Sequence, residues 1–247
     1  MTEDLLADTI TFEGANGDLL EAYFAEPLKP ESVGGVLVIH HLPGYDEATK
    51  EIVRRFAANG YLAICPNLYS REAPGASADD ASATVRALGG VPDDRFVEDA
   101  RQALNFLTTH KSSNGKVACI GFCSGGRQSV LAACSLQLDA AVDCYGGFVV
   151  SSTPDEPGRV QRMSLLSRLT NLSCPLLGLF GADDKRPSPD ETEILKTALE
   201  EHNKEFEFHT YEGAGHAFLA TDRPSYRPEA ANDAWTRIMI FFSRLLS

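Results

Sequence analysis

Short apolar runs alternate with amphipathic segments along most of this chain, and this alternation constrains the fold more than any other feature of the sequence. Residues 35–40 form a continuous apolar run, which is typical of a strand buried on both faces of a parallel sheet. Residues 47–59 follow, with apolar side chains at helical spacing and Gly60 as a stop signal. A strand followed by a helix of this length is the repeating unit of an α/β protein.

The same pattern continues to the C-terminus. We predict further strands at residues 61–65, 116–120, 138–145, 176–180 and 206–211, and further helices at residues 93–107, 126–136, 189–202 and 229–246. Residues 9–12 and 19–25 alternate in side-chain type and predict an antiparallel entry pair, residues 70–90 predict a long loop or short helices, and residues 151–172 are irregular. The sequence therefore predicts one mostly parallel, doubly wound α/β sheet flanked by helices, in a single domain over residues 1–247.

Composition narrows the classes of function. The chain has 22 basic and 35 acidic residues, a formal net charge of −13, which argues against binding to nucleic acid or to anionic membranes. The acidic N-terminus lacks the basic region of a secretory signal, and no apolar run approaches the ~20 residues of a membrane span, so we expect a cytoplasmic protein. In that compartment we expect the six cysteines to be free thiols. The absence of a Cys-x-x-Cys pair argues against a metal site, and we expect no cofactor.

The sharpest motif is Gly121-Phe122-Cys123-Ser124-Gly125, which lies between a predicted strand and a predicted helix. It has the form of a nucleophile elbow, Gly-x-nucleophile-x-Gly, with cysteine in place of serine. The helix N-terminus favours negative charge there and lowers the pKa of a thiol. Alone, the pattern fits a buried cysteine in a glycine-rich turn equally well, but its place after a mid-chain strand favours a nucleophile.

An elbow enzyme has its acid after a later strand and its histidine near the C-terminus. Asp184 follows the strand at residues 176–180, and His216 follows the strand at residues 206–211 in a glycine-rich loop. Asp183 is the alternative acid, although we expect it to form the turn. The order Cys123, Asp184, His216 predicts an α/β-hydrolase fold with a cysteine nucleophile.

The expected chemistry is acyl transfer. His216 accepts the proton of Cys123, Asp184 orients the imidazole, and the thiolate attacks an acyl carbon. We expect the oxyanion hole to consist of the N–H of Ser124 and a second N–H from the loop after residues 35–40. Pro43 in that loop has no N–H, so Leu42 is the expected donor.

Five segments resemble the dienelactone hydrolases, also called carboxymethylenebutenolidases: residues 65–75, 113–117, 181–184, 214–218 and the cysteine elbow. The resemblance spans most of the chain. It implies hydrolysis of an enol-lactone, of the kind formed in the breakdown of chlorinated aromatic compounds, through a cysteinyl acyl-enzyme. It also implies that Arg71 binds the substrate carboxylate, for which a planar guanidinium is suited. We include Tyr145 as a further substrate-binding residue.

Two positions depart from the pattern of that family. Where the family has a glutamate that interacts with the resting cysteine, this chain has His41, which we also assign to substrate binding. Where the family has a second carboxylate-binding arginine, this chain has Ala220, and Arg223 is a candidate substitute. These changes leave the three catalytic candidates intact. They make a neutral or differently shaped ester or lactone a plausible substrate.

The leading hypothesis is thus a hydrolase of a small-molecule ester or lactone, a monomer or small homo-oligomer. A thiol sensor or ligand-binding protein on the same fold is the alternative from a different class, since an exposed thiolate oxidises readily. A thioesterase or peptidase with residues 151–172 as a lid is the third. Arg159, Arg162 and Arg168 in that segment either attract anionic substrates or form a solvated face, and the second interpretation is favoured.

Overall fold

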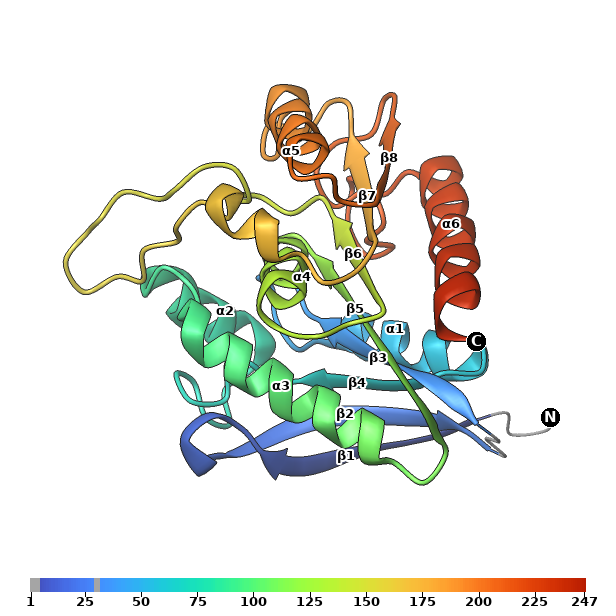
Figure 1. The fold of residues 1–247 in the computed structure, drawn as a ribbon. Helices are drawn as coiled ribbons and strands as arrows, with labels where there is room; N and C mark the ends of the chain where they lie inside the picture. The colour runs from blue at the N-terminus through green and yellow to red at the C-terminus, as the bar shows by residue number, and fades with distance from the viewer. Residues whose placement is uncertain (1–4, 29–31) are drawn as a thin grey trace.

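The computed structural model describes residues 5–28 and 32–247, and within them eight strands form one sheet in the order β1-β2-β4-β3-β5-β6-β7-β8 (Figure 1). The strands are β1 (Leu5–Glu13), β2 (Leu19–Pro27), β3 (Val33–Ile39), β4 (Leu62–Pro66), β5 (Ser113–Phe122), β6 (Ala140–Cys144), β7 (Leu176–Gly181) and β8 (Phe206–Tyr211). The helices are α1 (Glu47–Ala58), α2 (Ala78–Ala87), α3 (Asp93–Thr109), α4 (Ser124–Ser135), α5 (Pro189–Glu201) and α6 (Pro228–Leu246), with short 3₁₀ turns η1 (Ala15–Gly17) and η2 (Leu166–Asn171).

The order of the strands positions the site. Strands β3 to β8 run parallel, whereas β2 pairs antiparallel with both β1 and β4. From β3 the chain crosses to β4 on one side and then returns to β5 on the other side. The connections therefore diverge between β3 and β5, and parallel sheets bind ligands at the carboxyl ends of such strands.

Both faces of the central strands are buried, which explains the continuous apolar run in β3. Val36 and Val38 belong to the core under α1 and α6, whereas Leu37 and Ile39 belong to the core under α3, α4 and α5. Successive side chains of a strand point to opposite faces, so a strand covered on both sides needs apolar residues at every position. Figure 1 shows α6 and α1 on one side of the sheet and α3 and α4 on the other.

The predicted fold class is confirmed: the sheet is mostly parallel and doubly wound. Residues 70–90, predicted to be a long loop or short helices, form a loop followed by α2. Strand β6 ends at Cys144, one residue short of the prediction, because Tyr145 has φ of 47° and leaves the extended conformation. Among residues 5–28 and 32–247, no helix is long and apolar enough to cross a bilayer.

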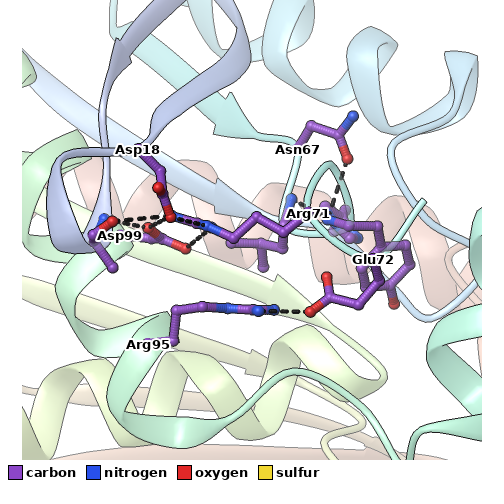
Figure 2. Close-up of polar contacts among 10 residues, drawn as sticks. Asp18, Asn67, Arg71, Glu72, Arg95 and Asp99 are labelled. Atoms are coloured by element: carbon purple, nitrogen blue, oxygen red, sulfur yellow. Dashed lines mark hydrogen bonds and ion pairs between the residues drawn. The ribbon is translucent and has the colours of Figure 1, made fainter. Parts of the chain in front are cut away.

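Arg71 joins the entry hairpin to α3 (Figure 2). Its two terminal nitrogens each donate to one oxygen of Asp99 at 2.9 Å, and its Nε donates to Asp18 at 2.8 Å. The Asp99 side chain is 0% exposed and also accepts the N–H of Ala15 at 2.7 Å. The bidentate pair thus fixes the turn between β1 and β2 against the helix.

The surroundings of Arg71 favour a structural role over the expected binding of a substrate carboxylate. The guanidinium already faces two carboxylates, and Arg71 is not among the residues that line the cavity around Cys123. Its hydrogen bonds to Asp99 and Asp18 raise its pKa further. We assign Arg71 a structural role.

Replacing Arg71 by methionine should destabilise the protein by about 3 kcal/mol, because the buried Asp99 would lose its charged partner. The free energy of unfolding in urea is the measurement. Arg101→Met is the matched control on α3: Arg101 pairs with Glu98 on the exposed surface, so its loss should cost less than about 1 kcal/mol. Equal losses for the two variants would contradict the structural role.

Candidate active site

Cys123 lies in the tight turn between β5 and α4. Its φ of 57° and ψ of −116° place a residue with a side chain in the region that glycine favours. The turn is held by the N–H of Cys123, which donates to the carbonyl of Cys144 at 3.0 Å, and by the N–H of Gly126, which donates to the carbonyl of Cys123 at 3.0 Å. Of the six free cysteines, the other five are buried and Cys123 alone is partly exposed.

The two glycines of the motif are required by close backbone contacts. A Cβ on Gly121 would lie 1.8 Å from the carbonyl oxygen of Gly125, and a Cβ on Gly125 would lie 2.3 Å from the carbonyl oxygen of Ile39. The first contact closes the elbow on itself. The second allows the start of α4 to approach the end of β3, so that the elbow and the loop after β3 face each other.

His216 and Asp184 approach Cys123 from the loops after β8 and β7. The Nδ1 of His216 is 2.8 Å from Oδ2 of Asp184, whose other oxygen accepts the N–H of Arg186 at 2.8 Å. Asp184 is buried, whereas Asp183 is exposed. The geometry therefore favours Asp184 over Asp183 as the partner of the histidine.

The thiol and the imidazole shift each other's ionisation. Burial raises the pKa of Cys123, but the hydrogen bond and charge of His216, together with the backbone N–H groups of Ser124 and Leu42, outweigh burial and hold the pKa below its usual value of 9.0. Burial lowers the pKa of His216, but its hydrogen bonds to Asp184 and Cys123 outweigh burial and raise the pKa to about 10. A thiolate beside an imidazolium is the resting state that these shifts favour.

The loop after β3 is anchored by two aromatic residues. The hydroxyl of Tyr69 donates to the carbonyl of Leu42 at 3.1 Å. The Nε2 of His40 accepts the N–H of Leu68 at 3.2 Å, so its Nδ1 carries the proton and donates to the carbonyl of His41 at 2.9 Å. Burial lowers the pKa of His40 to about 4, which keeps this ring neutral. The N–H of Leu42 is thereby held toward the sulfur of Cys123.

A cavity of about 380 Å³ opens above the cysteine. Cys123, His216 and Asp184 form part of its wall, together with Leu42 and Ser124. The remaining lining residues are Tyr69, Gly90, Val91, Arg127, Gln128, Gly147, Phe148, Arg162, Lys185 and Arg186. A cavity of this size accommodates a small organic molecule beside the thiolate.

The comparisons with known proteins agree with this architecture. The model of the dienelactone hydrolase family matches residues 20–246. The chain belongs to the dienelactone hydrolase family. As a member of this family it is a hydrolase.

Named relatives extend over nearly the whole chain. A “Putative carboxymethylenebutenolidase” of Salmonella typhimurium is 33% identical over 238 residues, which is 95% of this chain and 86% of that protein. A protein of the same name from Yersinia pestis is 35% identical over 235 residues, covering 93% and 85%. The crystal structure of a “Putative Dienelactone Hydrolase” from Klebsiella pneumoniae superposes with a TM-score of 0.85 at 29% identity, covering 97% of this chain and 99% of that one.

Two residues expected to bind substrate in this dienelactone hydrolase family member lie outside the cavity of Cys123. His41 and Tyr145 line a second cavity of about 320 Å³, as does Ala220. The Nε2 of His41 is 2.7 Å from Oδ2 of Asp46, the residue that caps α1. The ring of Tyr145 packs on the ring of His216 with centroids 5.3 Å apart. Arg223 pairs with Asp222 at 3.3 Å and lines neither cavity.

Sequence reasoning missed three residues of the site, Tyr69, His40 and Phe148. It considered Arg162 as a residue that attracts anionic substrates but favoured a solvated face. Tyr69 and His40 anchor the loop of Leu42, whereas Phe148 and Arg162 contribute to the cavity wall. Tyr69 lies in the segment at residues 65–75 that carried the family resemblance, which was the available signal. Within the described residues, no group of three or more potential metal ligands is present.

Gly125→Ala should destabilise the protein by about 3 kcal/mol, because the new methyl group would overlap the carbonyl of Ile39 and force the two strand ends apart. The free energy of unfolding measures this effect. Gly215→Ala is the control, since its new methyl group would lie 3.8 Å from the carbonyl oxygen of Asp183, an ordinary contact. A stable Gly125→Ala protein would contradict the proposed contact.

The reactivity of Cys123 toward iodoacetamide should follow a titration with a midpoint below pH 9, because the thiolate forms at its lowered pKa and is lost as the pH falls through it. His216→Asn removes the group that lowers the pKa and leaves the burial that raises it, so the midpoint should rise. Asp184→Asn should also raise it, and Asp183→Asn should not. A midpoint that stays the same in His216→Asn would exclude the ion pair.

Proposed function

We propose that this protein hydrolyses a carboxylic ester or lactone through the thiolate of Cys123, with His216 and Asp184 as its catalytic partners. The observation that carries the proposal is the hydrogen-bonded pair of His216 and Asp184 in the wall of the cavity that also holds Cys123. There His216 and the N–H groups of Leu42 and Ser124 lower the pKa of the thiol. The names of the relatives, carboxymethylenebutenolidase and dienelactone hydrolase, support an ester or lactone as the substrate.

The first half of the reaction forms a thioester. The thiolate attacks the acyl carbon, a C–S bond forms, and the carbonyl electrons move onto oxygen, where the N–H groups of Leu42 and Ser124 donate hydrogen bonds. The carbonyl then re-forms as the C–O bond to the leaving group breaks. The imidazolium of His216 gives its proton to the departing oxygen, which in a lactone stays tethered to the acyl group.

The second half returns the enzyme to its resting state. Neutral His216 takes a proton from water, and the resulting hydroxide attacks the thioester carbon. The C–S bond breaks, the sulfur leaves as thiolate, and the carboxylic acid is released. Asp184 holds the imidazole with one nitrogen toward the reacting atoms throughout both halves and stabilises its cation.

Steady-state hydrolysis of 4-nitrophenyl acetate tests this proposal. The wild-type protein should turn over many equivalents, and Cys123→Ala should lower the rate roughly 10⁴-fold or more without changing the free energy of unfolding. Intact-protein mass spectrometry of quenched wild-type reactions should show one added acetyl group, which Cys123→Ala lacks.

The thiol-sensor alternative makes the opposite prediction. A non-catalytic thiol would release one equivalent of 4-nitrophenolate and remain acetylated. Asp183→Asn serves as the matched control, because its exposed side chain neighbours Asp184 and should leave turnover unchanged. Full turnover by Cys123→Ala would reject the nucleophile assigned here.

A further inference from the structure

The charge of the cavity around Cys123 is opposite to that of the whole protein. The chain has a formal net charge of −13, yet the charged residues in this cavity wall, apart from the pair of Cys123 and His216, are four cations and one carboxylate. The four cations are Arg127, Arg162, Lys185 and Arg186. The carboxylate, Asp184, is already paired with His216. A local excess of positive charge in a cleft concentrates anionic ligands there.

Of these four cations, Arg127 is buried and Arg162 is half-buried, and the charge of Arg127 is already balanced by a carboxylate. Arg127 binds both oxygens of Asp93, at 2.7 and 2.8 Å, and also donates to the carbonyls of Phe148 and Met163. The guanidinium of Arg162, in contrast, has neither an ion pair nor a hydrogen bond with any part of residues 5–28 and 32–247. It is half-buried, and burial, followed by the charge of Arg127, lowers its pKa. A half-buried cation without a carboxylate partner is the feature expected where a ligand supplies the anion.

The backbone of Arg162 is held in place. Its N–H donates to the hydroxyl of Thr153 at 2.9 Å, and its carbonyl accepts the N–H of Thr153, also at 2.9 Å. The N–H of Val160 donates to the carbonyl of Leu88 at 2.7 Å, which ties this segment to the end of α2. Gly90 leaves room for the side chain, because a Cβ there would lie 2.7 Å from its terminal nitrogen.

Phe148 organises the positive wall. The guanidinium carbon of Arg162 is 5.4 Å from the centre of its ring, and that of Arg186 is 4.5 Å away. Phe148 has φ of 66°, a strained conformation that is typical of functional sites. An aromatic face contacts a guanidinium without using its N–H donors, so both groups keep those donors for a ligand.

We propose that Arg162, supported by Phe148 and Arg186, is the specificity-determining residue of this cavity and binds a carboxylate at the end of the substrate away from the scissile bond. This inference rests on the proposed ester hydrolysis at Cys123 and specifies its substrate class. It places anion recognition on the segment between β6 and η2, at a different position from Arg71. The preferred ester or lactone is therefore extended enough to reach from the thiolate to the wall formed by Arg162.

The test uses 4-nitrophenyl monoesters of adipic and suberic acid, each with a free distal carboxylate, and the corresponding methyl esters as neutral analogues. The wild-type protein should prefer the acid over its methyl ester, measured as a ratio of kcat/KM, for at least one chain length. Arg162→Met should reduce that ratio roughly 10- to 100-fold, the range expected for losing a hydrogen bond to a charged group. Turnover of the neutral ester should fall by a smaller factor than turnover of the acid.

Two further variants isolate the role of the guanidinium. Arg162→Lys keeps the charge without the planar fork and should recover part of the preference. Arg159→Met is the matched control: Arg159 lies in the same segment, pairs with Glu156 on the surface, and does not line the cavity. Its ratio should equal that of the wild type, and urea unfolding of all variants checks that the fold is retained.

Each contrary outcome has a distinct meaning. A wild-type ratio near one at both chain lengths, or one unchanged by Arg162→Met, would overturn the role of Arg162 while leaving hydrolysis by Cys123 intact. An equal loss for acid and methyl ester would also overturn it, because Arg162 would then act on the thiolate or oxyanion. Turnover of the methyl esters by Cys123→Ala would instead reject the proposed function itself.

Discussion

The approach of the Cys123 turn to the end of β3 is the contact on which the rest of the site depends. It exists because Gly121 and Gly125 have no Cβ, so backbone carbonyls occupy the space that side chains would fill. The contact brings the N–H of Ser124 and the N–H of Leu42 to the same sulfur, although they lie more than 80 positions apart in the sequence. It also positions Cys123 at the carboxyl edge of the sheet, where Asp184 and His216 lie in the loops after β7 and β8.

The electrostatics of the site explain how a cysteine serves in this turn. A partly buried thiol would resist ionisation, and four of the buried cysteines outside the site have pKa values raised well above the usual value, chiefly by burial. Cys123 differs because a cation and two N–H donors face its sulfur. Asp184 maintains that cation, since its hydrogen bond favours the imidazolium. In the mechanism that we propose, the thiolate is therefore formed before the substrate arrives, and His216 is ready as a proton donor to the leaving group.

Sequence periodicity predicted nearly all of the sheet, because strands covered on both faces need continuous apolar runs and their boundaries fall at glycine and proline. The order of motifs along the chain also placed Cys123, Asp184 and His216 at adjoining strand ends. The partners of Arg71 were out of reach of such reasoning: Asp18 and Asp99 lie 53 and 28 positions away, and nothing in the local pattern reveals a bidentate pair. Sequence reasoning could not predict that His41 and Tyr145 line a second cavity, because the cavity that a side chain lines depends on local backbone conformation.

The contrast between Arg71 and Arg162 shows how the same side chain acquires different roles. Each guanidinium is partly removed from water, which is unfavourable for a charge unless hydrogen bonds replace the lost solvent. The fold supplies that replacement to Arg71 through Asp99 and Asp18, and Arg71 thereby becomes part of the framework. For Arg162 the described part of the chain supplies an aromatic face and a fixed backbone but no anion. We therefore infer that a carboxylate of the substrate supplies the anion that pairs with Arg162.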